Sequence, residues 1–106
     1  MRTQHIEALI KKVIIRHVNP REALVFLFGS RAGRLGRLTS DYDIGIYRGR
    51  KIPLRLIAKI KDELEDYPIP VNIDIVDFST VSDDFKQLAL KKIKIWNKPK
   101  VDLKLI

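Results

Sequence analysis

The segment "LFGSRAGRLGRLTSDYDIGIY", Leu27–Tyr47, decides the fold of this 106-residue chain. An apolar run stops at Gly29-Ser30, gives way to arginines among small residues, and resumes after Asp41 and Asp43. Residues two apart in a strand point to the same face, so these two carboxylates would project side by side, with Cβ atoms roughly 7 Å apart. The segment therefore predicts two strands joined by a basic loop, with paired carboxylates at the start of the second strand.

The composition is that of a soluble globular protein, with 45% apolar and 32% charged residues. The length favours one domain over residues 1–106, because two separate cores would be too small to be stable. Cysteine is absent, which excludes disulfides and thiolate metal sites. The N-terminus does not resemble a signal peptide, and no apolar run approaches the ~20 residues of a membrane span. We therefore expect an intracellular, cytoplasmic protein.

The formal net charge of +8 and the pI near 9.9 call for a polyanionic partner. Nucleic acid, nucleotide phosphates and an acidic protein surface all fit, and charge alone does not choose among them. The lysines taken alone could simply form a solvated surface. The arginines differ because they cluster, at Arg31, Arg34, Arg37, Arg48 and Arg50.

Hydrophobic periodicity predicts an α/β (α+β) fold, in which a small mixed sheet of three to four strands is backed by helices on one side. The expected helices span residues 3–18, 53–68 and 82–96. The expected strands span residues 23–28, 41–47 and 71–78, with a short helix and a loop within 30–38. The second long helix carries Leu54, Ile57, Ile60 and Leu64, and we expect Phe85, Leu88 and Ala89 of the last helix to face inward. The tail from residue 97 could add an edge strand or remain loose.

A third carboxylate, Asp74, stands between Ile73 and Ile75 in the third expected strand, where an unpaired charge would be costly. If the second and third strands are neighbours, Asp74 converges on Asp41 and Asp43. Carboxylate oxygens are the ligands that Mg²⁺ prefers, so the three together predict a site for one or two ions. Each aspartate alone could equally be a turn, capping or salt-bridged residue.

Two further features adjoin this set. Asp77 lies three positions beyond Asp74, faces the other side of the sheet, and is expected to be a surface or capping residue. Gly29-Ser30 directly follows a buried strand, where glycine allows close backbone approach and the first N–H groups of a helix could bind an anion. A Gly-Ser after a strand is common, and it gains weight here only from the aspartates that follow.

The stretch "FGSRAGRLGRLTSDYDIGIY", followed by "VNIDIVDF", resembles the signature of the minimal nucleotidyltransferases (MNT, MntA-like antitoxins) of the DNA polymerase β-like superfamily. That signature is a strand, Gly-Ser-x-Ala-Arg-Gly, a few variable residues, Ser-Asp-x-Asp and an apolar strand, with a third aspartate about thirty residues on. The resemblance covers the chain from about Ala23 to Phe78. One departure is the order Ala32-Gly33-Arg34, where the family has Ala-Arg-Gly, which leaves open which arginine fills the family's role.

The resemblance implies a nucleotidyltransferase fold and a chemical role for each motif residue. Asp41, Asp43 and Asp74 would be the catalytic residues. They would hold two Mg²⁺ ions against a nucleoside triphosphate. Asp74 would also help to deprotonate the acceptor hydroxyl. The nucleotide-binding residues would be Gly29, Ser30, Arg31, Arg34 and Ser40, with Arg37 as a further candidate for neutralising phosphate charge.

The same resemblance implies transfer of AMP from ATP to a protein or small-molecule acceptor. Minimal members typically pair with a separate HEPN-domain protein as the antitoxin of a toxin–antitoxin module. This chain would then adenylylate a tyrosine of its HEPN partner within a hetero-oligomer.

Two other functions stay open at this point. A binding module could keep the fold and neutralise its partner by contact alone, although a pure binder gains nothing from clustered carboxylates. A nucleic-acid-binding protein would account for the net charge, but the sequence lacks a recognisable recognition motif, and the acidic set would repel phosphates without metal.

Overall fold

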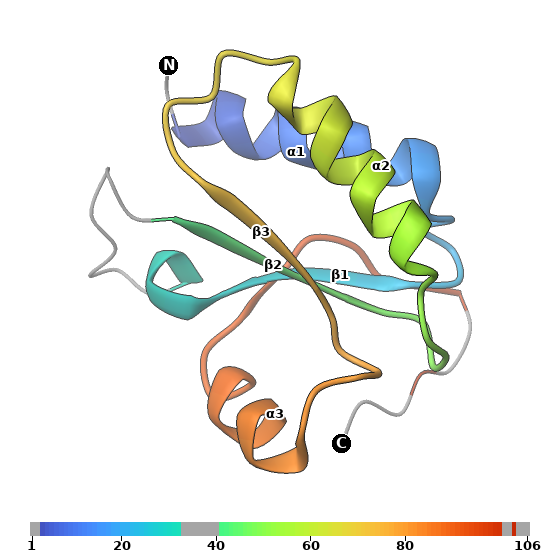
Figure 1. Ribbon diagram of the computed structural model, residues 1–106. Helices are drawn as coiled ribbons and strands as arrows, with labels where there is room; N and C mark the ends of the chain where they lie inside the picture. The colour runs from blue at the N-terminus through green and yellow to red at the C-terminus, as the bar shows by residue number, and fades with distance from the viewer. Residues whose placement is uncertain (1–2, 33–40, 101–102, 104–106) are drawn as a thin grey trace.

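The computed structural model describes residues 3–32, 41–100 and 103, and Figure 1 shows a sheet with helices on both of its faces. Its elements are, in chain order, α1 (Thr3–His17), β1 (Leu24–Phe28), the 3-10 helix η1 (Gly29–Ala32), β2 (Tyr42–Tyr47), α2 (Leu54–Glu65), β3 (Ile73–Asp77), α3 (Asp83–Ala89) and β4 (Lys94–Ile95). The first two long helices and the three main strands agree with the sequence prediction to within a few residues. Within the described ranges, every helix is too short or too polar to cross a lipid bilayer.

The four strands form one mixed sheet in the order β3-β2-β1-β4. β1 is antiparallel to both of its neighbours, β2 and β4, whereas β2 and β3 run parallel. Parallel neighbours need a long crossover connection, and α2 supplies it. This arrangement brings the beginning of β2 and the beginning of β3 to the same end of the sheet, and it confirms the mixed sheet.

The helices cover both faces of the sheet, so the prediction that they lie on one side is wrong. α1 and α2 lie on one face and α3 on the other (Figure 1). Val25 and Leu27 of β1 belong to the core under α1 and α2, whereas Phe26 and Phe28 belong to an aromatic cluster with Phe78 on the α3 side. Because β1 is apolar at every position, both of its faces must be covered, as in other strands buried on two sides.

The last helix is shorter than predicted, and it ends at Ala89 instead of continuing to Trp96. Its start is as expected, since the hydroxyl of Ser82 accepts a hydrogen bond from the Phe85 backbone N–H at 3.2 Å. The chain then turns and Lys94–Ile95 pairs with β1 as an edge strand. This edge strand therefore lies before the tail in which the sequence had suggested one.

Two side chains expected to face inward are exposed instead: Leu88 by 67% and Phe85 by 41%. In α2, Ile57, Ile60 and Leu64 are buried, whereas Leu54 at its first position is 75% exposed. The short helix α3 turns only part of its apolar surface towards the aromatic cluster. Helical spacing identifies an apolar face but does not fix how much of that face the sheet covers.

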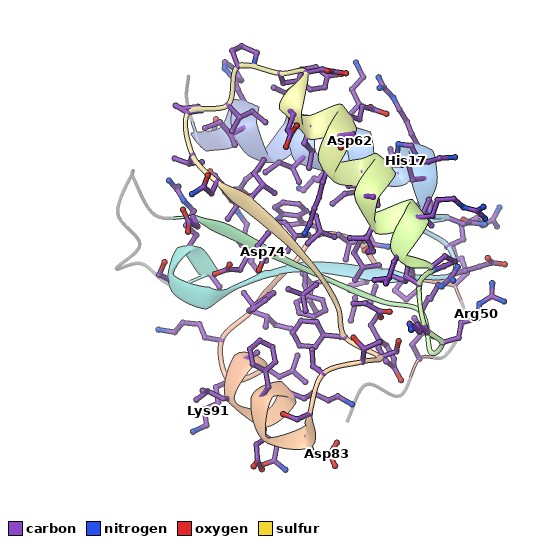
Figure 2. All side chains as sticks on the ribbon, viewed as in Figure 1. His17, Arg50, Asp62, Asp74, Asp83 and Lys91 are labelled. Atoms are coloured by element: carbon purple, nitrogen blue, oxygen red, sulfur yellow. The ribbon has the colours of Figure 1, made fainter. Side chains whose placement is uncertain are left out.

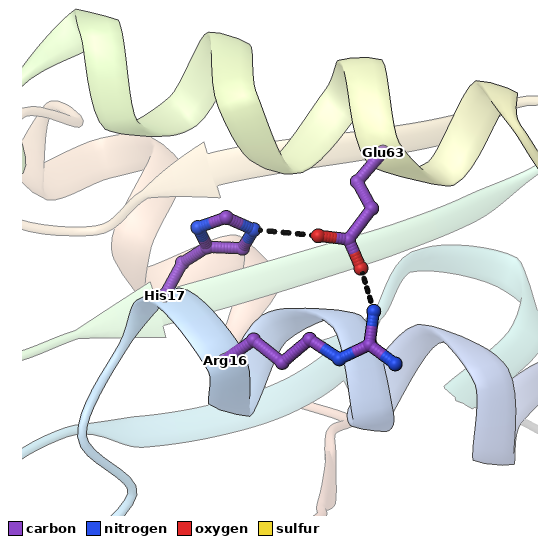
Figure 3. Close-up of polar contacts among 3 residues, drawn as sticks. All are labelled: Arg16, His17 and Glu63. Carbon is purple, nitrogen blue, oxygen red and sulfur yellow. Dashed lines mark hydrogen bonds and ion pairs between the residues drawn. The ribbon is translucent and has the colours of Figure 1, made fainter.

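A polar contact ties α1 to α2 across their exposed side (Figure 3). Glu63 of α2 forms an ion pair with Arg16 and accepts a hydrogen bond from its guanidinium. Its other carboxylate oxygen lies 3.0 Å from the imidazole Nε2 of His17. The hydrogen bond with His17, followed by the interactions with Arg16, lowers the pKa of the Glu63 carboxyl below its ordinary value. His17 is therefore part of the contact between the two helices.

Candidate active site

Asp43 and Asp74 lie side by side on the face of the sheet on which α3 also packs. Asp43 of β2 is opposite Phe28 of β1 and beside Asp74 of β3 in the register of the sheet. Neighbouring strands are about 5 Å apart, so the two carboxylates are close enough to interact directly. Figure 2 shows Asp74 on β3, near the beginning of that strand. The predicted convergence of the second and third strands is therefore confirmed.

Asp41 belongs to the same group of charges. Partial burial, followed by the negative charges of Asp74 and Asp41, raises the pKa of the Asp43 carboxyl above its ordinary value. Asp41 and Asp74 are both exposed and line the same hollow of about 610 Å³. The three aspartates thus form one acidic group, which we call the aspartate cluster.

Gly29, directly after β1, borders the aspartate cluster. Its φ of +73° is a conformation that residues with a side chain rarely adopt. A Cβ atom at this position would overlap the Oδ2 atom of Asp43, so the backbone approaches the carboxylate as closely as only glycine allows. Ser30 follows, exposed, within the four-residue turn of η1. Within the described residues, the helix expected after Gly29 is this single 3-10 turn.

A contact that the sequence did not suggest brings a cation to the aspartate cluster. The Nζ atom of Lys61 in α2 lies 3.9 Å from Oδ1 of Asp74, and both side chains are about half exposed. An exposed pair at this distance contributes little to stability. The sequence alone does not indicate this pair, because Lys61 reaches Asp74 only through the packing of the crossover helix α2 beside β3.

The hollow beside Asp41 and Asp74 is open and mainly polar at its rim. It lies between the end of α2 and the beginning of β3. Its lining combines the two aspartates with Lys61, Leu64, Glu65, Tyr67, Ile69, Val71, Asn72 and Ile73. We call it the β3 hollow.

Arg31, one of the predicted phosphate ligands, lies against a tyrosine. Its guanidinium is 4.2 Å from the centroid of the Tyr42 ring, and its Nη1 donates to the Tyr42 hydroxyl at 3.2 Å. Tyr42 is fully buried on the α1–α2 side of β2, opposite to the side of Asp43. Arg31 as a phosphate ligand stays a prediction. Gly33, Arg34, Arg37 and Ser40 lie outside the described residues.

Asp77 has the structural role predicted for it. Its carboxylate accepts hydrogen bonds from the backbone N–H of Ile52 at 2.7 Å and from the backbone N–H and hydroxyl of Ser79 at 3.0 and 2.7 Å. These bonds hold the loop before α2 against the end of β3. Asp77 therefore stabilises the end of β3, the strand that carries Asp74, and does not belong to the aspartate cluster.

The chemistry of the aspartate cluster suits a hard divalent cation. All three groups offer carboxylate oxygens. The raised pKa of Asp43 comes first from its partial burial and then from the negative charges of Asp74 and Asp41, and a bound cation would offset both. Over residues 3–32, 41–100 and 103, no three acidic, imidazole or thiol side chains are drawn together tightly enough to enclose an ion. Asp41 and Asp74 are exposed at the surface, so packing does not prevent their carboxylates from turning towards one.

The chain is similar to antitoxins of known structure. It is 27% identical over 85 residues to the "Probable protein adenylyltransferase MntA" of Haemophilus influenzae, which covers 80% of this chain and 74% of that protein. It also superimposes on a chain of the tri-AMPylated Shewanella oneidensis HEPN toxin in complex with MNT antitoxin, with a TM-score of 0.69 and 20% identity over 92% of this chain and 74% of the other. A toxin–antitoxin structure with AMP-PNP gives a TM-score of 0.70 and 22% identity over 87% and 73%.

These structural likenesses confirm the nucleotidyltransferase fold, with a mixed four-stranded sheet and three α-helices. At the level of sequence, the model of the family described as polymerase beta, nucleotidyltransferase, matches residues 9–100. That range includes the aspartate cluster, Gly29 and most of the fold. The chain therefore belongs to the polymerase β family of nucleotidyltransferases.

Proposed function

We propose that this chain, acting in the cytoplasm as a single minimal nucleotidyltransferase domain, transfers AMP from ATP to a tyrosine hydroxyl of a HEPN-domain partner. It would thereby serve as the antitoxin of a toxin–antitoxin pair. The family supports the reaction class. The relative named as a protein adenylyltransferase supports a protein acceptor, and the similar complex of an AMPylated HEPN toxin supports the partner. The similar complex with AMP-PNP supports an adenine nucleotide.

One structural observation carries the proposal: Asp41, Asp43 and Asp74 gather on one face of the sheet, directly beside Gly29. Asp43 is partly buried beside two other carboxylates, an arrangement that lowers the stability of the metal-free fold. A domain that only bound its partner would have no use for this arrangement. A carboxyl group with a perturbed pKa, such as that of Asp43, is a recognised mark of an active site when it lies beside a hollow.

In the proposed reaction, each residue binds, orients or moves a proton. Gly29 and Ser30 lie where the phosphate tail of ATP would pass the aspartate cluster. The acceptor oxygen attacks the α-phosphorus, the bond from this phosphorus to the oxygen bridging to the β-phosphate breaks, and pyrophosphate leaves. The proton of the acceptor hydroxyl goes to a carboxylate oxygen of Asp74, which lies on the side of the β3 hollow.

Asp41, Asp43 and Asp74 would hold Mg²⁺. Bound Mg²⁺ supplies positive charge that stabilises the entering and leaving oxygens of such a displacement. Without it, the aspartate cluster would repel the triphosphate, so the proposed reaction requires the metal.

The proposal is tested by incubating the protein with Mg²⁺, labelled ATP and the HEPN protein that co-purifies with it. Wild type should transfer label to the partner, and Asp41→Ala should lose at least about a hundredfold of this rate, as is usual for removing a group that stabilises transition-state charge. Equal labelling by the two proteins, or none by either, would sink the enzymatic proposal.

Neutralisation by contact alone is the alternative, and the activity of the partner, measured with and without ATP, separates the two. An antitoxin that acts by contact would suppress its partner in the absence of ATP. Its Asp41→Ala variant would suppress the partner as well as wild type does. A cheaper measurement is the melting temperature with ATP, with and without Mg²⁺, because only a metal-dependent nucleotide site gives a metal-dependent rise.

A further inference from the structure

A hollow of about 350 Å³ lies at the end of the sheet opposite to the aspartate cluster. It is formed where α1 ends, β1 begins and β2 ends, and its polar lining is His17, Asn19, Glu22, Arg48 and Arg50. Asp43 is four residues before the last residue of β2, so roughly 13 Å of strand separates it from this end of the sheet. Figure 2 likewise shows Arg50 far from Asp74. The hollow is therefore distinct from the candidate active site.

Positive charge is concentrated around this hollow. Arg48 and Arg50 line it, and Lys51 follows them in the same loop. Arg21 adjoins the lining through its neighbour in sequence, and its carbonyl accepts a hydrogen bond from the backbone N–H of Lys100 at 2.6 Å, which brings Lys100 to the same place. We call this surface the basic end, and it consists of Arg21, Arg48, Arg50, Lys51 and Lys100. Over the described residues, Glu22 is the one carboxylate in the lining of the hollow.

The side chain of Arg48 is held at the hollow with one donor unused. Its Nη2 donates to the backbone carbonyl of Lys51 at 2.8 Å. Its Nε is buried and has no hydrogen-bond partner in the described part of the chain. Buried donors normally have an acceptor, and leaving one without it is costly. An oxyanion in the hollow would supply that acceptor.

We propose that the basic end binds the phosphate backbone of a single-stranded nucleic acid, with a phosphate group in the hollow that Arg48 and Arg50 line. The planar guanidinium of arginine matches the oxygens of a phosphate and binds them with two parallel hydrogen bonds. The aspartate cluster would repel a nucleic acid in the absence of metal, but it lies at the other end of the sheet. The fold thus separates the cations that attract phosphate from the carboxylates that repel it.

The character of the hollow favours a nucleic acid over an acidic protein segment. Among the described lining residues, Val18 and Ala23 are the apolar ones, and both are buried, so a ligand would meet polar groups. Protein interfaces have an apolar centre, whereas interfaces with nucleic acids are more polar and much more positively charged. Proteins that bind single strands use a positively charged groove along the backbone, and a basic hollow fits that description.

The test measures binding of a fluorescently labelled oligouridylate RNA of about 12 nucleotides by fluorescence anisotropy. A chelating buffer ensures that no metal at the aspartate cluster holds phosphate. The variant is Arg21→Gln/Arg50→Gln, which neutralises two exposed arginines from two different loops of the basic end. The matched control is Lys91→Gln/Lys92→Gln, which removes the same charge from two exposed positions after α3.

Wild type should bind the RNA with a dissociation constant of about 10⁻⁴–10⁻⁶ M at physiological salt, the usual range for contacts to the backbone alone. The variant should bind at least about fivefold more weakly. Its plot of log affinity against log salt concentration should be less steep by about 1.4, since each phosphate contact on a single strand contributes about 0.7. The control should keep the wild-type slope.

Three results would overturn the proposal. Wild type could fail to bind the RNA even at low salt. The variant and the control could lose affinity equally, in which case the effect comes from net charge and not from the basic end. Labelled oligoglutamate could bind wild type as tightly as the RNA and be weakened by the same variant, in which case the basic end is a surface for an acidic protein. None of these measurements uses ATP or the HEPN partner, so their outcome is independent of the proposed function.

Discussion

Gly29 lies against the carboxylate of Asp43 so closely that a Cβ atom on Gly29 would overlap the Oδ2 atom of Asp43. The backbone of Gly29 also has φ near +73°, which favours glycine on its own account. Two independent constraints therefore fix glycine at the point where β1 ends. One is conformational and the other comes from the aspartate cluster, so the two can be separated by experiment.

Gly29→Ala should lower the free energy of unfolding by about 1–2 kcal/mol through its backbone alone. It should also displace the Asp43 carboxylate and weaken ATP binding. Gly49→Ala is the matched control, because Gly49 has φ near +78° but an added Cβ would meet only Leu103, at an ordinary 3.6 Å. Urea unfolding should show a loss in both variants, and calorimetry should show weaker ATP binding in Gly29→Ala alone. Equal ATP affinity in the two variants would contradict this role of Gly29.

Asp43→Asn should raise the melting temperature of the metal-free protein at pH 7 by about 3 °C, because it removes a partly buried charge beside two like charges. Because the pKa of Asp43 is raised in the folded state, protonation of this carboxyl favours folding. That contribution to stability is fully present below the ordinary pKa of 3.8 and is lost as the pH rises through the raised pKa. The gain of Asp43→Asn should therefore shrink as pH falls towards 3.8.

Differential scanning calorimetry in a chelating buffer measures this effect. Asp62→Asn is the control, since Asp62 is exposed on α2, and Figure 2 shows it away from Asp74. A gain for Asp43→Asn that does not depend on pH, or that Asp62→Asn reproduces, would refute the electrostatic explanation.

Gly45→Ala should destabilise the fold by about 1–3 kcal/mol, the usual cost of overpacking a core. A Cβ on Gly45 would overlap the rings of Phe26 and Phe78, which pack edge to face with centroids 4.7 Å apart on the α3 side. Chemical denaturation checks this directly. Wild-type stability in the variant would mean that the aromatic cluster is looser than the contact implies.

Asn97→Ala should cost about 2 kcal/mol, because it removes three hydrogen bonds at a partly buried site. The Asn97 side chain accepts from the backbone N–H of Val25 at 2.7 Å and donates to the carbonyls of Pro20 and Ala23, both at 2.7 Å. Asn97→Asp should also be costly, since the carboxylate cannot donate to either carbonyl. Urea unfolding of the two variants measures the cost, and losses below about 0.5 kcal/mol in both would contradict it.

The residues that act locally could be predicted from the sequence. The alternation of "DYDIGIY" predicts a strand that carries Asp41 and Asp43 on one face. The role of Asp77 follows from the same alternation. Both depend only on the two-residue period of a strand, which neighbouring elements do not alter. That Asp74 joins Asp41 and Asp43 depends in addition on the pairing of β2 with β3, which the sequence analysis could state only as a condition.

Features that depend on tertiary packing could not be predicted in the same way. The pairing of Lys61 with Asp74 depends on where α2 crosses the sheet, and the stacking of Arg31 on Tyr42 depends on the turn of η1. The sequence of β1 does indicate that a helix covers the second face of the sheet, because Phe26 and Phe28 are as apolar as Val25 and Leu27 and both faces must be buried.

The intact mass of the HEPN partner, after incubation with ATP and Mg²⁺, tests most directly whether the aspartate cluster transfers AMP. With wild type and with the control Asp62→Asn, the partner should gain the mass of adenylyl groups, and peptide mapping should place them on tyrosine. With Asp43→Asn, the partner should keep its original mass. An unmodified partner with wild type, or a partner modified equally well by Asp43→Asn, would contradict the proposed transfer.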